Sequence, residues 1–287
     1  MITRFAPSPT GRLHLGHALS AVTAHDRARL AGGAFRLRIE DIDPTRCRPE
    51  YADAILADLA WLGIGWDGPA VVQSTRLDHY AAALDRLIGE GLAYPCFCSR
   101  ADVAREVAAS LSAPHGADGP LYPGTCRRLP RAEAMARTAG EPHSWRLDVA
   151  AAIRRIGTPA WRDERAGTIA ADPLALGDII LKGRDRPASY HLAVVVDDAA
   201  AGVTLVVRGL DLFASTHVQR ILQAVLALPT PTYHHHRLIA GADGRRLAKR
   251  DAAAGLNRLR ADGADGPALA ELLRKGRLPI GFGWADA

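Results

Sequence analysis

Residues 2–30 of the chain are ITRFAPSPTGRLHLGHALSAVTAHDRARL, and this stretch decides the fold. Its first five residues are partly apolar, then prolines and a glycine interrupt the chain, and from His14 onward the apolar spacing is helical. The stretch therefore predicts a strand, a loop and a helix in that order. The N-terminus of such a helix favours phosphate, because its backbone N–H groups are free and its dipole is positive there.

Two histidines stand at the predicted start of this helix. His14 and His17 are three residues apart, which puts both on one face of the first turn. Their ring N–H groups can stabilise charge that develops on a phosphate during transfer. Gly16, between them, leaves room for a flat base against the helix. On spacing alone such a pair is more often incidental than catalytic, so its meaning depends on the rest of the chain.

A second strand is predicted at residues 35–39, where apolar and basic residues alternate. It ends in the acidic run EDIDP at residues 40–44, so the strand delivers carboxylates at its carboxyl end. Residues 51–62 and 77–88 have helical apolar spacing and are followed by glycines typical of helix ends.

Two later runs, residues 192–196 and 203–207, are too uniformly apolar for half-exposed strands. They predict buried strands of a parallel sheet, and they end in Asp197-Asp198 and in Arg208. Ligand sites collect at the carboxyl ends of such strands. The predicted fold class is therefore α/β with a doubly wound parallel sheet.

Composition and charge narrow the class of protein. The chain has 287 residues, nearly half of them hydrophobic, which is enough for one large domain or a domain that carries an insertion. Its net charge of +5 comes largely from arginine. Binding to nucleic acid explains this excess of positive charge as well as an ordinary solvated basic surface does. The N-terminus does not resemble a signal peptide, and the sequence shows no bilayer-spanning apolar segment. We therefore expect a cytoplasmic protein without a membrane segment.

The composition changes after residue 93, where cysteines, prolines and glycines predict an insertion. Cys96, Cys98 and Cys126 lie in this region, whereas Cys47 stands apart as an ordinary thiol. In a reducing cytosol, clustered cysteines indicate metal ligation more than disulfides. A tetrahedral zinc needs a fourth ligand, and chemistry alone prefers His115.

The segment His14-Leu15-Gly16-His17 resembles the HIGH signature of class I aminoacyl-tRNA synthetases. The segment RLAKR at residues 246–250 stands where their KMSKS loop would be, although Arg246 replaces the first lysine and Ala248 the hydroxyl residue. The segments RFAPSPTG from residue 4, RIEDIDPTR from residue 38, YHLAVVVDD from residue 190 and VRGLDL from residue 207 resemble the glutamyl and glutaminyl branch. This resemblance implies a Rossmann-like catalytic domain.

The resemblance also implies a set of site residues. The implied glutamate-binding residues are Arg4, Phe5, Ala6, Pro7, Ser8, Glu40, Tyr190 and Arg208. The implied ATP-binding residues are His14, Gly16, His17 and Lys249, and those other than Gly16 are also the implied catalytic residues. The implied ligands of one structural zinc ion are Cys96, Cys98, Tyr122 and Cys126, so that Tyr122 competes with His115. The roles make chemical sense, because an arginine can bind a carboxylate with two N–H groups and a carboxylate can accept from an α-ammonium.

The chain resembles glutamyl-Q tRNA(Asp) synthetases over almost its whole length, from Arg4 to the loop that carries Lys249. This resemblance implies that L-glutamate and ATP with Mg²⁺ give glutamyl-adenylate and pyrophosphate without any tRNA bound. Glutamate would then be transferred to queuosine in the anticodon stem-loop of tRNA(Asp), by a monomer. The alternatives are a truncated glutamyl-tRNA synthetase that charges tRNA(Glu), a small-molecule adenylyltransferase, and an RNA-binding relative without catalysis.

Four regions are expected on this interpretation. They are the first half of the catalytic domain at residues 1–93, a zinc-containing insertion at 94–186, the second half with the KMSKS-like loop at 187–250, and a short helical tail at 251–287 with no anticodon-binding domain.

Overall fold

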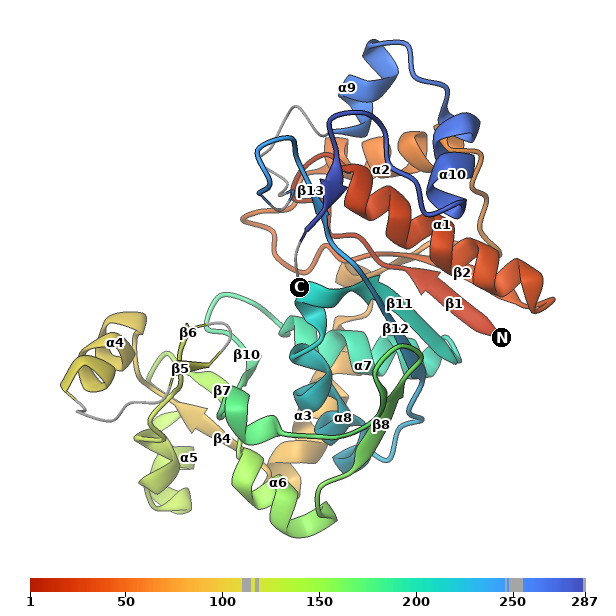
Figure 1. The fold of residues 1–287 in the computed structure, drawn as a ribbon. Helices are drawn as coiled ribbons and strands as arrows, with labels where there is room; N and C mark the ends of the chain where they lie inside the picture. Colours follow the sequence, from red (N-terminus) through yellow and green to blue (C-terminus); the bar gives the residue numbers. More distant parts are fainter. Residues whose placement is uncertain (110–114, 117–118, 246, 248–254, 286–287) are drawn as a thin grey trace.

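The computed structural model describes residues 1–109, 115–116, 119–245, 247 and 255–285 (Figure 1). The helices are α1 (Leu15–Leu30), α2 (Pro49–Trp61), α3 (Leu77–Gly89), α4 (Arg100–Ala109), α5 (Arg131–Arg137), α6 (Val149–Ile156), α7 (Tyr190–Ala200), α8 (Ser215–Val225), α9 (Leu256–Ala261) and α10 (Gly266–Arg274). The strands are β1 (Ile2–Phe5), β2 (Ala34–Ile39), β3 (Val71–Val72), β4 (Ala93–Cys96), β5 (His115–Gly116), β6 (Gly119–Pro120), β7 (Ser144–Leu147), β8 (Ala160–Asp163), β9 (Gly167–Ala170), β10 (Ile180–Lys182), β11 (Leu205–Gly209), β12 (Thr232–His236), β13 (Ile239–Ala240) and β14 (Gly283–Trp284). No helix in these described ranges is long and apolar enough to cross a membrane.

Parallel strands form the centre of the catalytic part, as the sequence predicts. β1, β2 and β3 pair in parallel, and β11, β12 and β8 do the same, with β9 antiparallel at the edge. β1 runs beside β11, because the Thr204 N–H donates to the Ile2 carbonyl at 2.9 Å and the Arg4 side chain reaches the Val207 carbonyl at 3.4 Å. The carboxyl ends of β1, β2, β11 and β12 therefore face the same side.

The predicted strand, loop and helix at the N-terminus are confirmed as β1 and α1. Apolar side chains of α1, including Leu15, Ala18 and Val22, are buried against β1, β2 and β11. α10, near the C-terminal end of the described chain, packs against α1 (Figure 1). The predicted glycine end of α2 is also confirmed, since Gly63 adopts a φ of 72° that a residue with a side chain rarely adopts.

The predicted strand at residues 192–196 is wrong, because these residues lie in helix α7. Ser189 caps this helix by accepting a hydrogen bond from the Leu192 backbone N–H. α7 packs against both α3 and α8, and most of its side chains are buried in a shared core. A helix enclosed in this way has no polar face, so its short apolar run cannot be distinguished from a buried strand by periodicity. The second run is a strand, β11, as predicted.

The region predicted as an insertion, residues 94–186, has its own antiparallel sheet. β4, β7 and β10 pair in the order β10-β7-β4, and α4 and α5 lie at this end of the molecule (Figure 1). The same region also contributes β8, which pairs with β12 of the parallel sheet through Asp163 and Tyr233. It is therefore tied to the catalytic part by β8 as well as by the chain itself.

Candidate active site

A cavity of about 480 Å³ opens at the carboxyl ends of the parallel strands. Residues from β1 and the loop after it, from the start of α1, and from the ends of β2 and β11 line it. The predicted site residues among them are Arg4, Phe5, Ala6, Pro7, Ser8, His14, Gly16, His17, Glu40, Tyr190 and Arg208. The fold thus brings every predicted glutamate-binding residue and the HIGH-like segment into one cavity.

The two histidines lie together at the N-terminus of α1. Their ring centroids are 3.8 Å apart. His14 accepts a hydrogen bond from the Gly16 N–H through Nδ1, and His17 accepts one from the His14 N–H in the same way, both at 3.1 Å. Because each Nδ1 is an acceptor, the proton of each neutral ring lies on Nε2. A side chain at position 16 would crowd His14, since a Cβ there would lie 3.0 Å from its ring.

Leu247 of the KMSKS-like segment and Gly255, after it in the chain, lie near this cavity. Leu247 lines the cavity, and its N–H donates to the Ile239 carbonyl at 3.0 Å. On the other side Gly255 forms a β-bridge with His14. Lys249, the predicted phosphate contact, lies outside the described residues.

Four buried charged side chains form one network under the cavity. Asp198 Oδ1 accepts from Arg38 Nη1 at 2.6 Å and from Arg4 Nε at 3.1 Å, and Arg38 Nη2 donates to Glu40 Oε1 at 3.0 Å. Burial alone would raise the pKa of Asp198, but the charges and hydrogen bonds of the two arginines outweigh it and hold the pKa below its ordinary value. The network therefore fixes Arg4 at the cavity wall, where Asp198 compensates its positive charge.

Glu40 responds differently to the same surroundings. Burial raises its pKa above the ordinary value, although Arg38 and Arg4 act against this shift. A cation placed beside Glu40 would lower the pKa and favour the carboxylate. An ammonium group of a ligand is such a cation, and it would offset the effect of burial on Glu40.

Arg208 is buried, with 5% of its surface exposed, and all of its side-chain acceptors within the described chain are neutral. The four acceptors are His235 Nε2 at 3.1 Å, Tyr190 Oη at 3.3 Å, Gln219 Oε1 at 2.9 Å and Thr216 Oγ1 at 2.6 Å. None of them carries a charge that compensates the guanidinium. A ligand carboxylate in the cavity would supply the missing charge.

Sequence reasoning missed several residues that shape this cavity. Asp198 holds Arg4 and Arg38 holds Glu40, yet in the sequence both stand inside longer motifs without a signal of their own. His235 and His236 belong to a run of three histidines at the end of β12, and that run was the one available signal. His236 Nε2 lies 2.6 Å from Ser20 Oγ and so connects β12 with α1.

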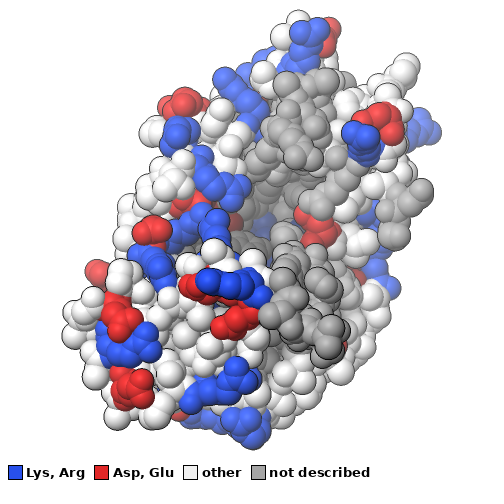
Figure 2. Space-filling view, turned by 90° about the vertical axis from the view of Figure 1, so that its left-hand side faces the viewer, with Lys and Arg blue, Asp and Glu red and all other residues white. Residues whose placement is uncertain are grey.

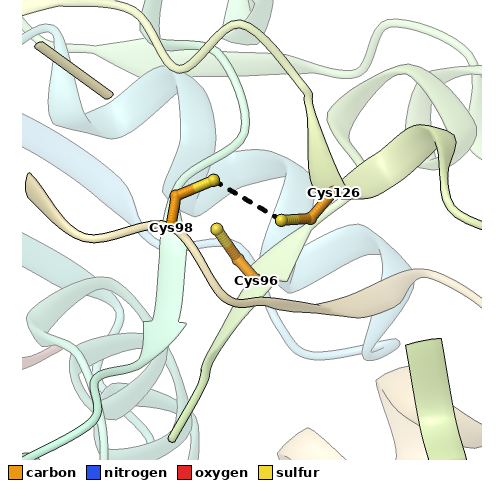
Figure 3. Close-up of side chains that lie close together, drawn as sticks. All are labelled: Cys96, Cys98 and Cys126. Carbon is orange, nitrogen blue, oxygen red and sulfur yellow. Dashed lines mark hydrogen bonds between the residues drawn. The ribbon is translucent and has the colours of Figure 1, made fainter. Parts of the chain in front are cut away.

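The three clustered cysteines come together, as predicted, outside the cavity (Figure 3). The sulfurs of Cys96, Cys98 and Cys126 lie within 4.8 Å of one another. Tyr122 Oη is 3.3 Å from the Cys96 sulfur and 3.6 Å from that of Cys98. Ligands of a tetrahedral zinc at about 2.3 Å stand roughly 3.8 Å apart, so these four side chains can hold a metal ion. The side chain of the alternative ligand, His115, lies outside the described part of the chain.

Comparison with known proteins places the chain in a family. The family model described as class I tRNA synthetases (E and Q), catalytic domain, matches residues 1–280. The chain belongs to this family. It is therefore an ATP-using ligase, and its cavity lies at the carboxyl ends of parallel strands, where ligands of open α/β sheets generally bind.

Individual members of the family that are similar to this chain carry more specific names. A glutamyl-Q tRNA(Asp) synthetase from Rhodobacter capsulatus is 51% identical over 92% of this chain and 96% of its own length. One from Symbiobacterium thermophilum is 48% identical over 91% of this chain and 81% of its own. A crystal structure of a glutamate tRNA ligase from Elizabethkingia meningosepticum, in complex with its amino acid, superposes with a TM-score of 0.78 at 26% identity. The match covers 95% of this chain and 60% of that one.

Proposed function

We propose that this ligase activates glutamate with ATP and transfers it to queuosine in the anticodon loop of tRNA(Asp). The observation that carries the amino-acid assignment is the buried Arg208, whose neutral partners leave its charge for a ligand carboxylate. The acceptor assignment is supported by the R. capsulatus relative, which carries that name and is similar over nearly its whole length. The enzyme would work as a monomer in the cytoplasm.

In the proposed first step, glutamate is bound by Arg4, Glu40 and Arg208 through its charged groups. Its α-carboxylate oxygen attacks the α-phosphorus of ATP, the bond to the bridging oxygen of pyrophosphate breaks, and glutamyl-adenylate forms. His14 and His17 donate Nε2–H groups to the phosphate as negative charge moves onto its oxygens. In the family pattern Lys249 acts on the same phosphates, and Mg²⁺ arrives with ATP.

In the proposed second step, a hydroxyl of the acceptor nucleoside attacks the carbonyl carbon and AMP leaves. The nucleic acid would be held mainly through its phosphates. Figure 2 shows Lys and Arg side chains distributed over one face of the molecule and interspersed with acidic ones. With a net charge of +5, we expect binding of the stem-loop to weaken as salt is added.

The acceptor can be tested with purified tRNAs and labelled glutamate. We expect label on tRNA(Asp) that contains queuosine, no label on tRNA(Asp) that lacks it, and none on tRNA(Glu). Removing the terminal adenosine from tRNA(Asp) should not block labelling, because its ribose is not the acceptor. Label on tRNA(Glu) that is abolished when its terminal adenosine is removed, with none on queuosine-containing tRNA(Asp), would show a shortened glutamyl-tRNA synthetase instead.

We also propose that the cysteine cluster holds one structural zinc ion through Cys96, Cys98, Cys126 and Tyr122. Three cysteine sulfurs and one phenol oxygen in a closed set leave no open position for a substrate, which is typical of a structural site. The ion would join β4 to the turn that carries Cys126, in addition to the hydrogen bonds that Cys96 makes to Tyr122 and the Phe97 N–H makes to the Cys126 sulfur. It would therefore stiffen the region of residues 94–186.

Metal analysis of the purified protein should give about one zinc per chain, as the four-ligand set requires. Cys98→Ser should lose most of the metal and melt at a lower temperature. Cys47→Ser is the matched control, because Cys47 lies apart from the cluster and should keep the metal. If His115→Ala loses the metal while Tyr122→Phe retains it, the fourth ligand is His115.

A further inference from the structure

A buried histidine and a buried aspartate lie directly behind Arg208, on the side away from the cavity. His235 comes from β12 and Asp163 from the neighbouring strand β8, and each side chain has 1% of its surface exposed. His235 Nδ1 lies 2.8 Å from Asp163 Oδ2, and its Nε2 accepts the Arg208 Nε–H at 3.1 Å. The three side chains therefore form a chain of hydrogen bonds that ends at the cavity.

The direction of these bonds follows from Asp163. Its Oδ1 accepts from the backbone N–H groups of Arg165 and Ala166, and its Oδ2 accepts from the backbone N–H of His235. Burial alone would raise the pKa of Asp163, but these hydrogen bonds and His235 hold it below the ordinary value, so the group is a carboxylate. A carboxylate only accepts, which places the imidazole proton on Nδ1 and leaves the Nε2 lone pair facing Arg208.

The imidazole also stays uncharged. Burial and the neighbouring Arg208 lower the pKa of His235 to about 4, although Asp163 acts in the opposite direction. At neutral pH the uncharged ring therefore accepts the hydrogen bond of the Arg208 Nε–H, and it leaves the positive charge of the guanidinium uncompensated. Gln219 and Thr216 take the other inward N–H groups of the guanidinium in the same neutral way.

We propose that His235, oriented by Asp163, is a positioning residue that fixes the Arg208 guanidinium and keeps its charge available for the acidic side chain of the substrate. A carboxylate at the position of His235 would fix the guanidinium equally well but would compensate its charge. A neutral acceptor with one defined proton position fixes the guanidinium and leaves its charge uncompensated. The proposal rests on glutamate activation in this cavity, and it assigns to His235 and Asp163 the preference for glutamate over glutamine.

The competing explanation is that His235 only fills space. Its ring stacks on Tyr233 and meets Trp161 and Phe213 edge-on, so it is part of an aromatic cluster. His217 belongs to the same cluster, since it contacts the Trp161 and Phe213 rings, yet it has no hydrogen bond to Arg208 among the described contacts. The same substitution at positions 217 and 235 therefore separates packing from positioning.

Nitrogen NMR of the wild-type protein with ¹⁵N-labelled histidine tests the proton position without any activity measurement. The His235 signals are identified by their loss in His235→Gln. We expect a neutral ring protonated on Nδ1 and not on Nε2 throughout pH 6–8. An Nε2–H or a charged ring would overturn the proposal, because neither can accept from Arg208.

Pyrophosphate exchange without tRNA tests the consequence. In His235→Leu the Arg208 N–H loses its acceptor, so we expect the KM for glutamate to rise on the order of 10- to 100-fold. The KM for ATP and the kcat should change little, and the glutamate-to-glutamine preference should fall. His235→Gln offers an amide oxygen in place of Nε2 and should restore the preference, whereas His217→Leu should leave all constants unchanged.

The outcomes separate this inference from the proposed function. If the wild type does not exchange pyrophosphate with glutamate, the proposed function fails, and the NMR result still reports on the hydrogen-bond chain. If the wild type is active but His235→Leu keeps its preference, or His217→Leu loses it equally, the positioning role is wrong. A folded His235→Gln with the defect of His235→Leu would contradict it as well.

Discussion

Replacing Asp198 with alanine should lower the free energy of unfolding by about 3–5 kcal/mol, because the change leaves two buried arginines without their shared anion. Asp198 Oδ1 accepts from both Arg4 and Arg38, and the three side chains are almost fully buried. Arg38 retains Glu40 and lies 3.9 Å from Asp197, whereas the described contacts leave Arg4 a long hydrogen bond to the Val207 carbonyl and the nearby charge of Glu40. The shift in the urea midpoint at an unchanged slope measures the effect.

Asp85→Ala is the matched control, since Asp85 is exposed on helix α3 and should change stability by less than about 0.5 kcal/mol. The pH dependence follows from the depressed pKa of Asp198. Its stabilising contribution is present above the unfolded-state pKa of about 3.9 and is lost as the pH falls through the lower, folded-state pKa. The difference between wild type and variant should therefore shrink in acid. If both alanine variants lowered the free energy of unfolding equally, the buried network of Asp198 would contribute no more to stability than an exposed aspartate does.

The beginning of the fold could be predicted from the sequence because several local signals agree there. The prolines and glycine after β1 interrupt the chain, and the apolar spacing from His14 onward has one interpretation. At residues 192–196 the local sequence signals and the tertiary packing favour different structures. Their valines favour a strand locally, and only packing against α3 and α8 decides for a helix.

The site was predictable where a motif is contiguous and unpredictable where it is assembled by the fold. His14, Gly16 and Glu40 stand in segments that match a family pattern, and the structure brings them into one cavity. The contact between Arg4 and Asp198 joins residues 194 positions apart, for which a single sequence holds no signal.

The histidine run at the end of β12 shows the same limit on a smaller scale. Three consecutive histidines on a strand alternate between its two faces. Here His234 is half-buried and His235 is buried against Arg208, whereas His236, the last residue of β12, contacts Ser20 of α1. Which of them supports a substrate group depends on the neighbouring strand, because Asp163 arrives from β8.

Glutamine should be a poor substitute for glutamate in pyrophosphate exchange carried out without tRNA. Arg4 is compensated by Asp198, whereas the acceptors that hold Arg208 are neutral, so Arg208 depends most on the charge of the substrate. Replacing a carboxylate by an amide leaves this buried cation without its partner, at about 2–5 kcal/mol. The ratio of kcat/KM for the two amino acids should therefore be roughly 30- to 5,000-fold.

Arg208→Gln should remove most of that preference, because an amide has no charge for the substrate to satisfy. We expect kcat/KM for glutamate to fall by about the same factor, and kcat/KM for glutamine to change much less. Arg277→Gln is the matched control, since Arg277 is exposed and lies outside the cavity, and it should behave as wild type. If Arg208→Gln slows both amino acids equally, Arg208 binds a group that they share, and the side-chain carboxylate must be recognised elsewhere in the cavity.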